Sequence, residues 1–535
     1  MRLTGIPLLA SALVLAGAAP VAAQPRPPDP PAVVRTDLGP VRGQVQSGHR
    51  LFQGIPYAAP PTGDLRWRPP QPARPWTGTY DATFPRSQCA QLAPPYGGET
   101  TYVEDCLYLN VTTPNPNRAH RRKPLPVMVW VHGGSNTTGS GSTYNAAKLA
   151  VDGDVVVVTV NYRLGPLGWL AHPGLETGAD RGYQAGNYGL LDQQAALRWV
   201  QRNARAFGGD PRNVTLFGES AGAADSCANL VSPTAAGLFH KVIAQSFSCT
   251  TPVRTEASAE ADGTVLAEAV GCGDGSPAAC LRAVPAQTLL ETFAAKGMSA
   301  GPVAGGVAGG ASGGATGGDR VLPLQPAQAI EQGRFNRMPV MHGNTLDEMR
   351  LFVSLYYPRP ITAAQYEAIV RSTYGADADA VLARYPAGDY ADPRIALSTI
   401  QTDAGGALSS CLHQDAFRLL KRAGVPVYAY QFADRTAPPL LDVPGFEEGA
   451  EHATELTFLF PGLLGELNPA QTRLSDTMVG YWTSFAHNGK PAARQAPHWP
   501  RFHSPDDVLS LAPGPGGIHR VDTTKTSNCT FWNTL

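Results

Sequence analysis

The sequence predicts an α/β protein with a mostly parallel central sheet and helices on both faces of that sheet. Two segments, residues 125–131 and 155–161, are continuous apolar runs, which is typical of parallel strands buried on both faces. A third strand, residues 214–217, leads through a sharp turn into a helix of small residues. Residues 190–206 carry apolar side chains at helical spacing, and this alternation of strands and helices favours a parallel sheet.

Shorter elements are expected before and after this centre. Strands are predicted at 33–36, 41–46 and 108–112, whereas 51–75 is rich in proline and aromatic residues without a helical period and is expected to be an ordered loop. No internal repeat is visible. The remaining predicted elements are strands at 241–245, 338–343 and 427–432 and helices at 258–270, 346–353, 363–373, 407–423 and 477–488.

Residues 33–535 are expected to form one domain that contains a glycine-rich insertion. The insertion, residues 301–318, reads GPVAGGVAGGASGGATGG and is low in complexity. Strand and helix patterns resume after it without a change in composition. It is therefore predicted to be a flexible surface loop rather than a linker between domains.

The first residues have the pattern of a secretory leader. Arg2 precedes an apolar run, 8–19, that is too short to cross a bilayer, and the small residues 21–23 suit cleavage before Gln24. We expect residues 1–23 to be removed and 24–32 to be a proline-dense spacer; a lipid-embedded anchor is the alternative. No later stretch has about 18 consecutive apolar residues, so a secreted protein without a membrane span is predicted.

Composition argues against several function classes. Lys and Arg number 42 against 43 Asp and Glu, and this near-neutral balance gives no reason to expect nucleic acid or an anionic membrane as a partner. The 8 cysteines include no C-x-x-C pair and no His/Cys cluster, so no metal site is expected. An even number of cysteines in an exported chain indicates disulfides, although spacing alone does not fix their pairing.

The strand at 214–217 runs into a G-x-S-x-G pattern, Gly218-Glu219-Ser220-Ala221-Gly222. The two glycines allow a tight turn that exposes the serine hydroxyl and frees the N–H group of the next residue. By itself the pentapeptide is common in ordinary loops. Between a buried strand and a helix it indicates a nucleophile elbow.

A serine hydroxyl needs a base that takes its proton and a third group that orients that base. In hydrolases with a nucleophile elbow these partners follow in the order Ser, Asp or Glu, His. Asp347 and Glu348 come after a predicted strand and are equal candidates for the acid. His452 lies in a loop before an apolar helix, but spacing does not choose it over His413 or His487.

Longer motifs extend this pattern along the chain: G-I-P-Y-A from Gly54, E-D-C-L-Y-L-N-V from Glu104, His132-Gly133-Gly134, N-Y-R-L-G-P-L-G from Asn161, the elbow stretch 187–226, D-E at Asp347 and H-A-T-E-L-T-F-L-F from His452. In these motifs the chain resembles the type B carboxylesterase/cholinesterase family, and within it secreted bacterial para-nitrobenzyl esterase-like carboxylesterases, from about residue 36 to its end. The resemblance implies an α/β-hydrolase fold whose long loops form a gorge.

The resemblance also implies a reaction. It makes Ser220 the nucleophile, Glu348 rather than Asp347 the acid, and His452 the base of a serine carboxylesterase. The expected substrate is a small-molecule carboxylic ester, which is cleaved through an acyl-enzyme without a cofactor.

The residues around the nucleophile can be carried over in the same way. The family's oxyanion donors match the backbone N–H groups of Gly134, Ser135 and Ala221. Asn136 stands where an aromatic residue is usual, which predicts a more polar pocket wall, and Phe247 is expected to narrow the acyl side. These residues are the predicted substrate contacts, together with Glu219, which either tunes the charge of the site or is a buried, hydrogen-bonded carboxylate.

Disulfide pairs follow from the resemblance. It implies Cys89–Cys106, Cys272–Cys280 and Cys411–Cys529, and leaves Cys227 and Cys249 for a fourth bridge. With Cys411 present we expect Cys529 to pair within the chain and the protein to be a monomer; a dimer is the alternative. The Cys89–Cys106 loop has no tryptophan, so the choline platform of cholinesterases is absent and a quaternary ammonium substrate is not expected.

Two other functions fit the same fold. A non-catalytic cholinesterase-like binding protein would typically lack the nucleophile, and Ser220, Glu348 and His452 are all present. A lipase or amidase variant would need a broad apolar lid or a pocket for an amine leaving group, and no segment has either pattern.

Overall fold

The structure is a computed structural model that describes residues 32–115, 123–175, 185–305 and 321–535. The predicted leader, residues 1–23, and the predicted spacer up to residue 31 lie outside the described residues. Most of the glycine-rich insertion, residues 306–318, lies outside them as well.

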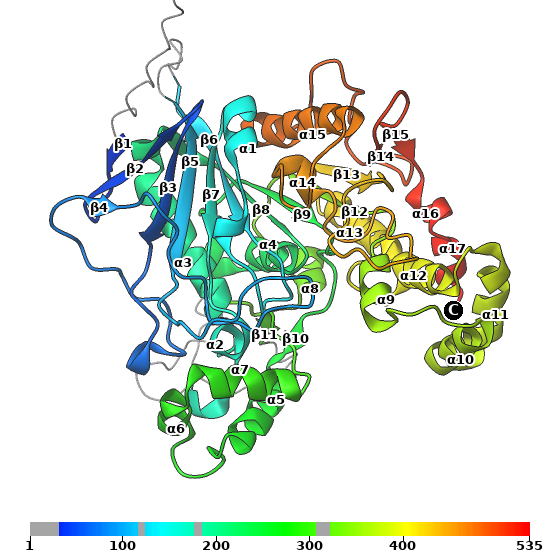
Figure 1. Cartoon of the computed structure of the whole chain (residues 1–535), viewed down its shortest axis with the longest axis horizontal. Coiled ribbons are helices and arrows are strands. Elements are labelled where there is room, and N and C mark those ends of the chain that lie inside the picture. The colour runs from blue at the N-terminus through cyan, green and yellow to red at the C-terminus, as the bar shows by residue number, and fades with distance from the viewer. Residues whose placement is uncertain (1–31, 116–122, 176–184, 306–320) are drawn as a thin grey trace, which may run out of the picture.

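Strands of the described residues fall into one large sheet and one small ribbon (Figure 1). The strands are β1 Ala32–Arg35, β2 Pro40–Gln46, β3 His49–Pro56, β4 Tyr80–Asp81, β5 Tyr108–Pro114, β6 Leu125–Val131, β7 Val156–Val160, β8 Gly209–Glu219, β9 Lys241–Gln245, β10 Arg254–Thr255, β11 Val303–Ala304, β12 Val340–Thr345, β13 Val427–Phe432, β14 Val508–Leu511 and β15 His519–Val521.

Helices connect these strands and cover them. They are α1 Ala147–Gly153, α2 Gly165–Trp169, α3 Tyr188–Asn203, α4 Ala221–Val231, α5 Glu256–Ala269, α6 Pro277–Ala283, α7 Ala286–Ala295, α8 Pro326–Glu331, α9 Arg350–Tyr356, α10 Ala363–Tyr374, α11 Ala378–Arg384, α12 Pro393–Ala404, α13 Ser410–Arg422, α14 Leu456–Leu459, α15 Pro469–Asn488, α16 Thr523–Thr526 and α17 Cys529–Trp532.

The large sheet is parallel in its centre and antiparallel at its edges. Its order is β1-β2-β3-β5-β7-β6-β8-β9-β12-β13-β14-β15, with β4 beside β2. Every neighbouring pair from β7 to β14 is parallel, whereas β3, β5 and β15 pair with their neighbours antiparallel. The predicted mostly parallel sheet is therefore confirmed.

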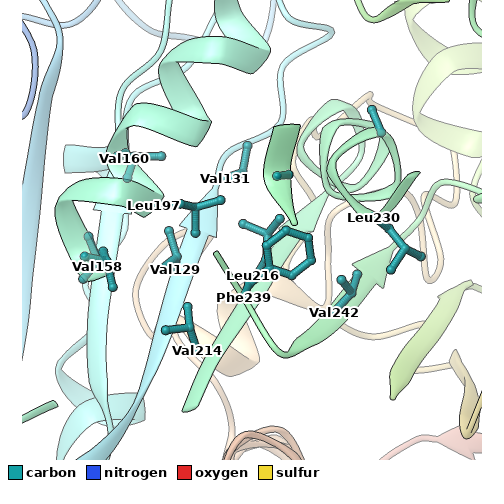
Figure 2. Packing of buried hydrophobic residues seen from close by; sticks show 14 of the residues in the cluster. Val129, Val131, Val158, Val160, Leu197, Val214, Leu216, Leu230, Phe239 and Val242 are labelled. Atoms are coloured by element: carbon teal, nitrogen blue, oxygen red, sulfur yellow. The ribbon is translucent and has the colours of Figure 1, made fainter. Parts of the chain in front are cut away.

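Alternation of side chains along the central strands builds one core on each face of the sheet. On one face, Val129 and Val131 of β6 pack in a buried cluster with Leu197 of α3 and Leu230 of α4, as Figure 2 shows. Burying a side chain of this size contributes about 1.5–3 kcal/mol. This core holds α4, the helix that directly follows Ser220, against the sheet.

The opposite face is covered by α1 and α15. Trp130 of β6 is fully buried there, and its ring lies 4.7 Å from the ring of Phe217 and 4.9 Å from that of Phe460. Leu149 of α1 and Trp482 of α15 belong to the same cluster. Residues 125–131 form a continuous apolar run because both of their faces are buried in this way.

Several predicted boundaries were wrong. Residues 49–56 form β3, although 51–75 was expected to be a loop, and the strand bends where its register with β5 shifts between Phe52 and Ile55. The predicted helix 346–353 begins only at Arg350, because residues 346–349 form a turn. The helix α15 begins at Pro469, eight residues before the prediction, behind a capping box on Asn468.

Part of the glycine-rich insertion is also more ordered than predicted. Val303 and Ala304 form β11, which pairs parallel with β10, and both are buried. The N–H group of Gly305 donates to the carbonyl oxygen of Leu322 at 3.0 Å, so the two chain segments that flank residues 306–320 are held together. The first residues of the insertion are therefore part of the core rather than a surface loop.

Four disulfides join Cys89 to Cys106, Cys227 to Cys249, Cys272 to Cys280 and Cys411 to Cys529, which are the pairs that the sequence suggests. Within the described ranges, no helix is long and apolar enough to cross a membrane. The same ranges hold no group of three or more His, Cys, Asp or Glu side chains arranged to bind a metal ion.

The disulfides differ in the length of chain they close, and this predicts unequal contributions to stability. Replacing Cys411 and Cys529 together by serine opens a separation of 118 residues and should lower the free energy of unfolding by about 4–5 kcal/mol. The same replacement at Cys272 and Cys280 opens 8 residues and should cost only about 2–3 kcal/mol. Urea titrations of the two double variants measure this order; equal losses would contradict it.

Candidate active site

The turn between β8 and α4 holds Ser220 in an unusual backbone conformation. Its φ is 57° and its ψ is −124°, a region that residues with a side chain rarely adopt. The Ser220 N–H group donates to the carbonyl oxygen of Gln245 at 2.9 Å, and its own carbonyl accepts the N–H group of Ala224 at 3.0 Å. The neighbouring strand and the new helix thus hold the strained turn in place.

The two glycines of the G-x-S-x-G pattern are required by packing. A Cβ atom on Gly218 would lie 2.4 Å from the carbonyl oxygen of Gly222. A Cβ atom on Gly222 would lie 2.0 Å from the carbonyl oxygen of Val131 in β6. Because both obstacles are backbone atoms that cannot move aside, only glycine fits either position.

His452 lies between two buried carboxylates. Its Nδ1 atom is 2.6 Å from Oε2 of Glu348, and its Nε2 atom is 3.0 Å from Oε1 of Glu219. The first contact is a hydrogen bond. The second has the distance of an ion pair but not the alignment of a hydrogen bond, and Oε1 of Glu219 has no hydrogen-bond partner among the described residues.

These carboxylates control the charge of the imidazole. Burial by itself would lower the pKa of His452, but Glu219 and Glu348 outweigh burial, and the net pKa lies well above its usual value. Glu348 is held in turn by the N–H group of Thr345, which donates to its Oε1 at 2.7 Å. In the resting site the imidazole is therefore protonated over a wider pH range than in water.

The other sequence candidates lie elsewhere. Asp347 accepts from Nε of Arg435 at 2.8 Å and from the N–H group of Ala450 at 3.1 Å, so its oxygens are used in the support of a loop. His413 is buried with Nδ1 2.8 Å from the carbonyl oxygen of Ser409. Nε2 of His487 lies 3.0 Å from the carbonyl oxygen of Gly153, at the exposed end of α15.

The strip that follows β6 lies beside the elbow. Gly134, Ser135 and Asn136 all have positive φ, at 102°, 54° and 57°. Ser135 and Ala221 line the same cavity as Ser220. Among the residues that the structure describes, no acceptor is assigned to the N–H groups of Gly134, Ser135 or Ala221, so these donors are available to a ligand.

Asn136 lines the cavity, and its side chain is anchored by a hydrogen bond to α4. It is only 2% exposed, and its Nδ2 atom donates to Oδ1 of Asp225 at 3.2 Å. Its backbone carbonyl accepts the N–H group of Gly165 at 2.7 Å. Asp225 also accepts from Nε2 of Gln193 at 2.5 Å, and burial raises the pKa of Asp225 to about 7.

The cavity that Ser220 faces has a volume of about 520 Å³. Phe247 lies in its wall. The wall is mostly apolar or small and is formed by Ser135, Asn136, Thr137, Ser220, Ala221, Ala224, Phe247, Pro252, Val253, Arg254, Met298, Ser299, Ala300, Gly301, Pro302, Phe352, Ala407 and Leu408.

Three residues near the site escaped the sequence analysis. Asp225 supports Asn136, Gln245 accepts from the elbow, and Arg254 lines the cavity. Asp225 did carry a signal, because it is an acidic residue within the small, apolar start of a helix. Gln245 was predicted only as the end of a strand, and Arg254 carried no signal, since the roles of both depend on contacts between distant segments.

Residues 30–532 match the model of the Carboxylesterase family. The chain belongs to the carboxylesterase family. It is accordingly a carboxylic-ester hydrolase with an α/β-hydrolase fold.

Individual relatives support this membership over most of the chain. The chain is 34% identical to the fumonisin B1 esterase of Sphingopyxis macrogoltabida, over 96% of this chain and 92% of that protein. It is also 34% identical to the para-nitrobenzyl esterase of Bacillus subtilis, over 88% of this chain and 92% of that protein. A solved structure of PNB esterase superposes with a TM-score of 0.73 at 30% identity, covering 93% of this chain and 98% of the other.

The raised pKa of Asp225 predicts how this carboxylesterase responds to pH. A carboxyl group whose pKa is higher in the folded than in the unfolded protein contributes its full stabilisation at a pH below its pKa in the unfolded protein. For Asp225 this contribution is lost as the pH rises through the folded pKa of about 7. Relative to Asp225→Asn, the wild type should lose up to about 4 kcal/mol of unfolding free energy between pH 4 and pH 8. Denaturant titrations of both proteins across this range measure the difference. A difference that stays constant with pH would contradict the prediction.

Proposed function

We propose that this carboxylesterase hydrolyses its ester substrate with a triad of Ser220, His452 and Glu348. The observation that carries the proposal is the hydrogen bond of 2.6 Å between Nδ1 of His452 and Glu348. With Nδ1 engaged, Nε2 is the ring nitrogen that remains to exchange a proton, and Ser220 directly follows Glu219, whose side chain lies 3.0 Å from that nitrogen.

The reaction then proceeds in two steps. As Nε2 of His452 takes the hydroxyl proton, Oγ of Ser220 forms a bond to the ester carbonyl carbon, and the carbonyl oxygen becomes an oxyanion. The intermediate collapses, the C–O bond to the alcohol breaks, and His452 returns the proton to the departing oxygen. Water attacks the acyl-enzyme by the same route, which releases the carboxylic acid and restores the serine.

Charge on the intermediate would be held by backbone donors. We assign this role to the N–H groups of Gly134, Ser135 and Ala221, since two of these residues line the cavity with Ser220 and none of the three groups has an assigned acceptor in the described part of the chain. Losing one such donor typically costs about 2.7–4 kcal/mol of transition-state stabilisation. Glu348 keeps the imidazole oriented and stabilises its positive charge during the reaction.

Glu219 has a separate role in this proposal. Its carboxylate stabilises the protonated imidazole from the side of Nε2, so at a given pH a larger share of the resting enzyme has no neutral imidazole to act as the base. Once the proton has moved, the same charge stabilises the imidazolium. Glu219 therefore shifts the pH at which the enzyme becomes active.

We also propose that the protein works in an oxidising compartment outside the cytoplasm. Four disulfides and the absence of any unpaired cysteine support this location, because such bonds persist where thiols are not kept reduced.

The triad is tested by comparing the mature protein with Ser220→Ala on 4-nitrophenyl esters with acyl chains of two to twelve carbons. We expect turnover by the wild type and a fall in kcat of at least about 10⁴-fold in the variant, because no other group supplies the nucleophile. Activity that survives in a folded Ser220→Ala protein would mean that another residue is the nucleophile. A folded wild type that cleaves none of these esters would favour a binding function.

The role of Glu219 predicts a shift in the pH profile. His452 acts as a base only when neutral, so kcat/KM of the wild type should fall as pH drops below the raised pKa of His452. Glu219→Gln removes one of the two carboxylates that raise this pKa and should move the acidic limb to lower pH by about one unit or more. Glu367→Gln, on the exposed surface of α10, is the matched control and should leave the limb in place. An unchanged limb in Glu219→Gln would contradict the proposed role.

A further inference from the structure

One residue with a charged side chain lines the cavity beside Ser220, among residues that are otherwise uncharged. Among its described lining residues, Phe247, Met298 and Phe352 contribute apolar surface, and Arg254 alone carries a charge. A charged group beside an apolar cavity is costly unless it has a partner. The partners of this guanidinium therefore decide what it can still bind.

Backbone contacts on both sides fix the position of Arg254. It belongs to β10, where it pairs with Val303 of β11 in the parallel ribbon. The preceding residue, Val253, is held by the side chain of Gln325, which accepts its N–H group at 2.8 Å and donates to its carbonyl oxygen at 3.0 Å. The arginine is thus mounted on a rigid segment rather than on a free loop, as a preorganised binding group requires.

One acidic residue orients the guanidinium from the solvent side. Nη2 of Arg254 donates to Oδ2 of Asp262 in α5 at 2.7 Å. The side chain of Asp262 is 46% exposed, whereas that of Arg254 is 18% exposed, so water weakens the attraction between them. A guanidinium has five N–H donors in a planar fork, and this pair uses one of them.

The rest of the site would repel an anionic substrate. Glu219 and Glu348 are both buried against His452, whose imidazolium balances only one of these two carboxylates. Burial and the charges of Glu219 and Glu348 raise the pKa of Glu455 to about 8, so Glu455 is mostly neutral at pH 7 and adds no cation. An ester with a negative charge would enter this field only if a cation compensated for it. Arg254 is the cation that the cavity wall supplies.

We propose that Arg254 binds a carboxylate of the ester substrate, so that the preferred substrates are esters with a free carboxylate on the acyl or the alcohol part. The proposal rests on the proposed function, because it takes Ser220 as the point of attack. Arg254 is a specificity residue that contacts the substrate away from the reacting atoms. Its planar fork suits a carboxylate, which accepts two parallel N–H donors.

The test uses pairs of esters in which one member has a free carboxylate and the other has a neutral group in its place. Mono-4-nitrophenyl adipate and mono-4-nitrophenyl suberate carry the charge on the acyl part and are compared with 4-nitrophenyl hexanoate and octanoate. On the alcohol part, 4-carboxyphenyl butyrate is compared with 4-carbamoylphenyl butyrate. The quantity measured is the ratio of kcat/KM for the charged over the neutral ester, at low and at high salt.

In Arg254→Met we expect this ratio to fall by about 10- to 100-fold in whichever of the two series, acyl or alcohol, brings its carboxylate to Arg254. The fall should come mainly from a higher KM for the charged ester. Arg254→Lys, which keeps the charge but loses the fork, should give an intermediate ratio. Asp262→Asn removes the ion pair but keeps the guanidinium, so its ratio should stay at or above that of the wild type. High salt should lower the wild-type ratio.

Other results would overturn the proposal. If Arg254→Met leaves the ratio unchanged in every series, Arg254 does not bind the carboxylate. If Asp262→Asn and Arg254→Met lower the ratio equally, the ion pair is merely structural. Neutral esters keep this test separate from the proposed function, because their cleavage by the wild type and not by Ser220→Ala depends on the nucleophile alone.

Discussion

Parallel pairing of the central strands is the constraint on which the whole site depends. Val131 of β6 lies beside Gly218 of β8, and Glu219 lies beside Gln245 of β9. Gly343 of β12 in turn lies beside Gln245. Because parallel strands end at the same edge of a sheet, the segments that follow them meet there, although they are far apart in sequence. These segments are the strip 134–136, the turn at Ser220, the wall with Phe247 and the loop with Asp347 and Glu348.

Strain at this edge is balanced by the same pairing. Ser135, Ser220 and Ser246 each follow a central strand closely and each have a positive φ between 54° and 57°. Conformations of this kind cost about 1–3 kcal/mol each and persist only where the surroundings enforce them. The N–H group of Ser220 donates to Gln245 and that of Ser246 to Gly343, so the sheet continues its hydrogen bonds into the strained turns. The rigid sheet thus sets the positions of groups that would otherwise relax.

Features built from residues that are neighbours in the chain could be predicted from the sequence. Features that depend on contacts between residues far apart in the chain could not. The elbow was predictable because strand, glycines and helix are neighbours in the chain, and the parallel sheet because its strands are apolar on both faces. The proposed acid and base could be chosen only through the family resemblance, since Asp347 and Glu348 are adjacent and three histidines have no distinguishing spacing. The role of Asn136 could not be predicted, because its partner Asp225 lies 89 positions away. β3 was missed because glycine and proline near its end imitate a loop.

The hydrogen bond between Gly305 and Leu322 marks a place where the length of the chain can vary. It joins the segments on either side of residues 306–320, directly after β11, which pairs with β10. Doubling the length of such a closed segment costs only about 0.6 kcal/mol in chain entropy. Natural variants, or an inserted peptide or small domain, can therefore change the chain length between Gly305 and Leu322 at little cost in chain entropy while the pairing of β10 with β11 is kept.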